Sequence, residues 1–130
     1  NSIIENNYKV VIGVRNKIPR FSEKLFNIYT KNIHGLIDAL SGMKAYSVDI
    51  FNFIDIKKFK NSIGTYYALE SSRNNNNIKQ ININVIDRID GQARIGNTCK
   101  VEFNIIKALV GCILVDIFYK ISMGLKKWLK

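Results

Sequence analysis

The chain contains 130 residues, with 20 Lys and Arg against 10 Asp and Glu, which gives a formal net charge of +10. Hydrophobic residues make up 47% and charged residues 23%, which excludes a disordered chain and suits one globular domain over residues 1–130. The charge favours an anionic partner, such as nucleic acid, an acidic lipid surface or a large complex.

The first part of the chain predicts one strand followed by one or two helices. Residues 8–14 form a β-branched run that is typical of a strand, and Pro19 suits the first turn of a helix. Apolar residues then recur at helical spacing through about residue 41, where Ser41-Gly42 is expected to end the helical stretch. We expect Gly35 to divide this stretch into two helices.

From Lys44 onward the apolar period changes to two, which predicts about four antiparallel strands. The first of them begins at Lys44 and places Tyr46, Val48 and Ile50 on one face, and a bulge is expected near Ile50, where the alternation breaks. A second strand is predicted over residues 64–71, before a polar loop at 73–77.

Asp90-Gly91 is the clearest local signal and predicts a two-residue turn between strands over residues 80–89 and 92–103. Residues 104–130 then carry apolar side chains at spacings of three and four, which predicts one long amphipathic helix. We expect this helix to face the sheet through Leu109, Ile113, Ile117 and Ile121, in contact with Ile83, Val101 or Phe103.

The order of these elements predicts an α+β fold, in which a curved antiparallel sheet grips the long C-terminal helix. One or two shorter helices follow the first strand. Lys107, Asp116 and Lys120 interrupt the apolar surface of the long helix, so a membrane span is disfavoured.

The predicted last strand, Cys99-Lys100-Val101-Glu102-Phe103, runs into a helix in which small and large apolar residues alternate from Leu109 to Met123. In this order, residues 98–130 resemble the end of the helix-grip family (START and Bet v 1-like domains), most nearly its polyketide-cyclase and coenzyme Q-binding branch. The resemblance implies a hydrophobic or lipid-like ligand held between helix and sheet.

No catalytic or metal-binding set is recognisable from the sequence. His34 is the sole histidine, and we expect a structural role for it. Asp116 and Lys120 are spaced i,i+4, which is typical of an ion pair on a helix surface. Cys99 and Cys112 lack metal or redox spacing, so we expect two free buried thiols and an intracellular reducing compartment, cytoplasmic or organellar. We predict no catalytic residue, no cofactor and no metal.

These patterns favour a non-catalytic binding module that holds an apolar small molecule or lipid, or docks to an anionic membrane or large complex. The alternatives are a nucleic-acid-directed protein, either an RNA-binding component or a small nuclease toxin, and a structural accessory subunit. The expected ligand-binding residues are Phe51, Phe53, Tyr66, Tyr67, Val101, Phe103, Ile113 and Ile117. The expected contacts with an anionic surface are Lys120, Lys126, Lys127 and Lys130.

Overall fold

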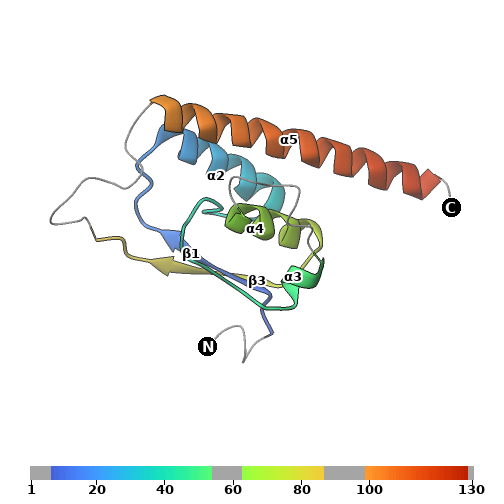
Figure 1. The fold of residues 1–130 in the computed structure, drawn as a ribbon, viewed down its shortest axis with the longest axis horizontal. Helices are drawn as coiled ribbons and strands as arrows, with labels where there is room; N and C mark the ends of the chain where they lie inside the picture. The colour runs from blue at the N-terminus through green and yellow to red at the C-terminus, as the bar shows by residue number, and fades with distance from the viewer. Residues whose placement is uncertain (1–6, 54–62, 87–98, 129–130) are drawn as a thin grey trace.

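The computed structural model of the protein describes residues 7–53, 63–86 and 99–128 and has an α+β fold (Figure 1). In chain order the elements are β1 (Val10–Arg15), α2 (Phe21–His34), β2 (Lys44–Tyr46), α3 (Ile50–Phe53), α4 (Ile63–Arg73), β3 (Ile78–Ile83) and α5 (Cys99–Trp128). The predicted α+β class and the long C-terminal helix are confirmed.

The sheet has the strand order β2-β1-β3 and is mixed. β1 pairs with β2 in the antiparallel direction, with Val11 opposite Ala45, and with β3 in the parallel direction, with Val11 opposite Lys79. A parallel pair needs a crossover connection, which the helices between β1 and β3 supply. The prediction of about four antiparallel strands is therefore wrong for the described residues.

The central strand β1 contributes its inward side chains to the core. Val10 and Ile12 are buried in one apolar cluster with Phe26 of α2 and Tyr67 of α4. Removing a large aliphatic or aromatic side chain from water stabilises a fold by about 1.5–3 kcal/mol. The cluster therefore joins the sheet to both helices that cover it.

α2 ends at Gly35 and does not divide into two helices that reach residue 41. Gly35 adopts the left-handed conformation, with a φ of 69°, and its N–H donates to the carbonyl oxygen of Lys31 at 3.1 Å. Glycine is favoured at such a cap because a Cβ is strained at positive φ. The chain then leaves the helix axis, and Leu36 is buried in the core.

Residues 64–71 belong to helix α4 and not to the predicted strand. Tyr66, Tyr67, Ala68 and Leu69 are buried in succession, and an unbroken apolar run fits a buried strand as well as a buried helix. Packing on both sides of α4 overrides the β preference of the two tyrosines.

β2 begins at Lys44, as predicted, but ends at Tyr46 and is shorter than the predicted strand, which continued to Ile50. Strand pairing stops at Tyr46. Beyond it, the N–H of Ile50 donates to the carbonyl oxygen of Ser47 at 3.2 Å, and the N–H of Phe51 donates to the carbonyl oxygen of Val48 at 3.1 Å. These turn-type bonds lead into the short helix α3. The expected bulge near Ile50 is therefore a helix start.

α5 begins at Cys99, so Val101 and Phe103 lie on this helix and not on a strand before it. The helix packs against α2, which lies between α5 and the sheet (Figure 1). Ile117 and Ile121 are 47% and 53% exposed. Their predicted contact with the sheet is wrong, because α2 and α4 occupy that face. The predicted turn at Asp90-Gly91 lies outside the described residues.

The fold predicts a contrast between two phenylalanines. Phe26 is 1% exposed and Phe103 is 69% exposed. We expect Phe26→Ala to lower the free energy of unfolding by about 3–5 kcal/mol, because it leaves a cavity in the core. The same change at Phe103 should alter it by no more than about 0.5 kcal/mol. Urea unfolding followed by circular dichroism measures both, and equal losses would contradict the packing described above.

Candidate functional site

The predicted ligand-binding residues divide between two parts of the structure. Phe51 of α3 makes an edge-to-face contact with buried Tyr67 of α4, with 4.9 Å between ring centroids. Phe53 is the last residue of α3, and Tyr66 is buried on α4. The other four, Val101, Phe103, Ile113 and Ile117, are spread along α5. None of the eight lines the two pockets described below.

Asp116 of α5 is the centre of a polar cluster that joins three helices. It is 7% exposed, and its Oδ2 accepts a hydrogen bond from the Tyr29 hydroxyl at 2.5 Å and lies 2.8 Å from His34 Nε2, both on α2. Its Oδ1 accepts from Arg73 Nε of α4 at 2.7 Å. Asp116 is therefore not part of the predicted surface pair with Lys120, and His34 takes part in this cluster.

The partners of Asp116 keep its carboxylate charged. Burial raises the pKa of Asp116, but hydrogen bonds from Arg73, Tyr29 and His34 outweigh burial and hold the pKa below its usual range. The Tyr29 hydroxyl stays protonated as a donor, because burial and the carboxylate both raise its pKa. A charge that is satisfied in this way can stay inside the protein.

Glu102, the other acidic residue of α5, also makes a bond within the structure. One of its oxygens accepts the backbone N–H of Ser22 at 3.0 Å, in the first turn of α2. Hydrogen bonding to Ser22 lowers the pKa of Glu102. A carboxylate is favoured there because a helix N-terminus carries unpaired N–H groups and positive potential. Both acidic residues of α5 are thus engaged with α2.

The outer face of α5 is left with apolar and cationic side chains. Its exposed apolar residues recur at spacings of three and four, namely Val110, Leu114, Ile117, Phe118 and Ile121. Lys107 and Lys120 are exposed along the same helix. Lys126 and Lys127 fall near the end of α5, and Lys130 lies outside the described residues.

The C-terminal part of α5 extends beyond α2 and α4 (Figure 1). We call residues 117–128 the α5 arm. Every residue from 117 to 122 is exposed, and Phe118 is 69% exposed. Within the described residues, no helix is long and apolar enough to cross a membrane.

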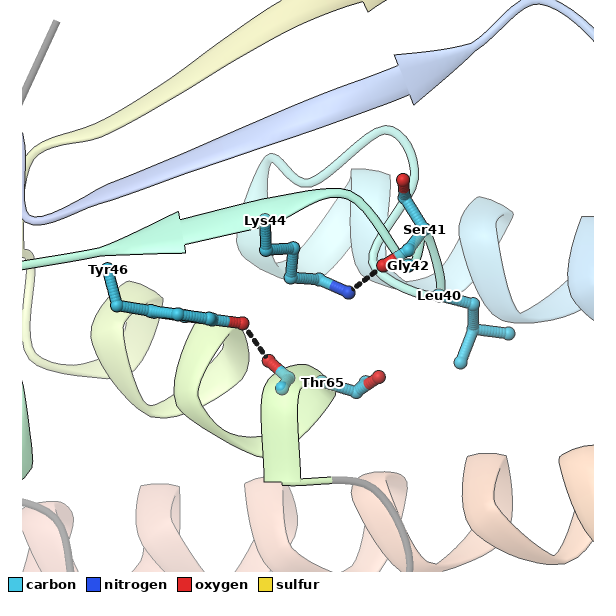
Figure 2. A pocket seen from close by; sticks show the side chains of 7 residues that line it. Leu40, Ser41, Gly42, Lys44, Tyr46 and Thr65 are labelled. Atoms are coloured by element: carbon cyan, nitrogen blue, oxygen red, sulfur yellow. Dashed lines mark hydrogen bonds between the residues drawn. The ribbon is translucent and has the colours of Figure 1, made fainter. Parts of the chain in front are cut away.

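A separate pocket of about 270 Å³ lies between β2 and the first turn of α4 (Figure 2). Lys44 and Tyr46 enter it from the same face of β2, because residues two apart on a strand point the same way. The Lys44 amine donates to the carbonyl oxygen of Ser41, and the Tyr46 hydroxyl donates to that of Gly64 at 2.5 Å. Thr65 also lines the pocket.

Burial lowers the pKa of the Lys44 amine to about 8. Asp38 opposes this shift, and the positive charge of Arg15 adds to it. Burial also raises the pKa of Tyr46, so its phenol stays neutral. The pocket therefore combines an amine that titrates near physiological pH with a fixed hydroxyl donor.

A second pocket, of about 350 Å³, lies at the C-terminal ends of α2 and α4 and is lined by His34, Ser72, Asn75 and Gln80 among others. The His34 side chain is only 4% exposed, and its Nε2 is already engaged by Asp116. No group of three His, Cys, Asp or Glu side chains that could hold a metal ion occurs in the described parts of the chain.

Sequence patterns missed the main features of these sites. Asp116 could have been recognised, because it follows Leu109 and Cys112 at helical spacings on the face that turns inward. Nothing in the sequence distinguished Lys44 from the other lysines. Of the two cysteines, Cys112 is buried as predicted, but Cys99 is exposed at the start of α5, and both thiols are free.

No family model matches the chain, and neither a curated protein nor a solved structure matches it significantly. The function must therefore be inferred from the side chains and their placement.

The Asp116 cluster predicts loss of stability in acid. The pKa of Asp116 is lower in the folded protein than in the unfolded chain, so its contribution is present above about pH 4 and is lost as the pH falls through the folded pKa. Asp116→Asn should cost roughly 3–5 kcal/mol at neutral pH, because it leaves Arg73 without its charge partner. Its unfolding free energy should also fall less steeply below pH 4 than that of the wild type.

Denaturant unfolding between pH 2 and pH 7 measures both effects. Asp49→Asn is the matched control, because Asp49 forms an exposed pair with Lys9 at 2.7 Å. This control should behave almost as the wild type, since exposed pairs contribute little. A similar loss in the two variants would contradict the role given to Asp116.

Proposed function

We propose that the protein is a non-catalytic binding module that docks to an anionic membrane surface through the α5 arm. The observation that carries the proposal is the distribution of charge on α5. Its two acidic residues, Glu102 and Asp116, bond to α2 and α4, whereas Lys107 and Lys120 are exposed beside apolar side chains. Such a surface attracts an anionic layer and offers apolar area to it.

The expected energetics favour a lipid surface. An exposed side chain such as Phe118 or Ile121 gains up to about 1.5–3 kcal/mol on full transfer to an apolar phase. Each lysine near an anionic leaflet adds about 1 kcal/mol. Tyr119 is partly exposed between them, and tyrosine is favoured at the boundary of lipid and water. Several such contributions together support reversible docking.

The other half of the sequence-based expectation, an apolar ligand between the helix and the sheet, has less support. α5 rests on α2, so its contacts with the sheet are few. The resemblance to the helix-grip family and the reducing compartment both remain predictions. The α+β class agrees with the helix-grip resemblance, and the free thiols of Cys99 and Cys112 agree with a reducing compartment.

The nucleic-acid alternative and the accessory-subunit alternative also remain predictions. Sequence-specific RNA binding commonly uses exposed aromatic rings for base stacking. Tyr66 and Tyr67 are buried, so neither ring is available. Membrane docking needs no ring for base stacking and uses residues of the α5 arm that are already exposed.

Vesicle co-sedimentation tests the proposal. The wild-type protein should bind phosphatidylglycerol-containing vesicles and bind neutral phosphatidylcholine vesicles weakly, with added salt reducing the difference. Phe118→Asp should lower partitioning to the anionic vesicles roughly tenfold or more, because it removes apolar area and adds a repelled charge.

Phe103→Asp is the matched control, since Phe103 is as exposed as Phe118 but lies near the other end of α5. It should leave vesicle binding almost unchanged. Equal losses in the two variants, or no preference for anionic vesicles, would overturn the proposal. Concentration-dependent dimerisation without vesicle binding would instead assign the arm to a second copy of the chain.

A further inference from the structure

We propose that the pocket between β2 and α4 captures small polar aldehydes as a Schiff base on the Lys44 amine. This site is separate from the α5 arm and does not depend on membrane docking. Three features support it: the placement of the amine, the hydroxyl donor beside it and the polar lining of the pocket.

The Lys44 amine reaches into the pocket without a carboxylate partner. Among the residues that the structure describes, no Asp or Glu forms an ion pair with Lys44, whose amine bonds instead to the neutral carbonyl oxygen of Ser41. A neutral acceptor stabilises the ammonium less than a carboxylate does, so the neutral, nucleophilic amine is accessible. Burial also lowers the pKa of the Lys44 amine and so favours its neutral form.

A buried ion pair beside the pocket holds the segment that carries Lys44. Asp38 is fully buried and accepts from Arg15 Nε at 2.7 Å and from Arg15 Nη2 at 2.9 Å. It also accepts from the Asn27 side chain at 3.2 Å. The charge of Asp38 is thus satisfied by Arg15, which leaves Lys44 as the cation that faces the pocket.

Tyr46 provides the second group that the reaction uses. Its neutral hydroxyl, now bonded to Gly64, can turn to the carbonyl oxygen of a bound aldehyde and polarise the C=O bond. Figure 2 shows the Lys44 amine and the Tyr46 hydroxyl directed into the same space. The pocket holds about 270 Å³ and has hydroxyl groups in its lining, so it has room for a polar aldehyde of a few carbons.

The reaction is balanced without a further reactant. The amine lone pair forms a C–N bond as the carbonyl π bond breaks, and nitrogen gives up one proton while the oxygen takes one up, which gives a neutral carbinolamine. The carbinolamine hydroxyl then leaves as water while nitrogen loses a proton and the C=N bond forms. One water is released for each aldehyde, no oxidation or reduction occurs, and hydrolysis reverses the capture.

Reductive trapping of the full chain tests the site. The protein is incubated with glycolaldehyde and cyanoborohydride at about pH 7.5, and peptide mass mapping then gives the labelling rate of each lysine. Lys44 should be labelled roughly tenfold or more faster than exposed lysines, because their amines titrate near 10.4. Its rate should rise with pH around 8, well below the pH at which the rates of exposed lysines rise.

Variants separate pocket capture from simple amine reactivity. Lys44→Met should abolish the fast labelling, while Lys31→Met, at an exposed position of α2, should not affect it. Tyr46→Phe should slow labelling of Lys44 without abolishing it. Cinnamaldehyde, whose apolar ring does not match the polar lining of the pocket, should label Lys44 no faster than exposed lysines.

The site-resolved rates in the wild type decide the matter even if a variant fails to fold. Labelling of Lys44 at the rate of exposed lysines would overturn the proposal. Equally fast labelling by glycolaldehyde and cinnamaldehyde would also overturn it, because the reactivity would then not depend on the polar lining of the pocket. Vesicle binding tests the α5 arm independently, so failure of one proposal leaves the other standing.

Discussion

The carboxylate of Asp116 is the interaction on which the arrangement of the helices depends. It accepts hydrogen bonds from Tyr29 and Arg73 and contacts His34, so one side chain of α5 is bonded to both α2 and α4. Apolar contacts alone would allow a long helix to rotate or slide, because hydrophobic attraction is not directional. A buried charge removes this freedom, since any other rotation would leave Asp116 without partners.

The rotation of α5 in turn determines what the protein presents to its surroundings. With Asp116 and Cys112 facing inward, Leu114, Ile117 and Phe118 must face outward. A helix that is apolar on most sides is normally covered on most sides. The α5 arm extends beyond α2 and α4 (Figure 1), and its residues 117–122 are exposed. The exposed lysines agree with the proposal that an anionic membrane surface contacts this arm.

A second buried charge organises the segment between α2 and β2. Asp38 connects the segment after α2 to Arg15 at the end of β1, and Arg15 also pairs with Glu23 of α2 at 2.9 Å. This pairing anchors the chain just before β2. Lys44 is thereby held beside α4, in a place where its own charge is poorly solvated. Asp116 and Asp38 thus both join separate elements through a buried carboxylate. Around Asp116 this leaves the apolar side chains of α5 exposed, and around Asp38 it leaves the Lys44 amine facing the pocket.

The sequence by itself determined the α+β class, the first strand, the helix that follows it and the long terminal helix. These elements rest on local patterns, such as the β-branched run of β1 and the helical spacing in α5. Strand and helix were confused where the local signal was ambiguous. Tyr66 and Tyr67 favour a strand by propensity, yet the run of residues around them is buried on all sides and forms α4.

Only the tertiary structure decided which face of each element is buried. The apolar stripe of α5 is nearly continuous around the helix, so Ile117 and Cys112 were equivalent in the sequence although one is exposed and the other buried. The partners of Asp116 and Asp38 come from residues distant in the chain, and no local spacing identifies them. The low pKa of Lys44 likewise depends on burial between β2 and α4, because desolvation is a property of the folded surroundings and not of the residue.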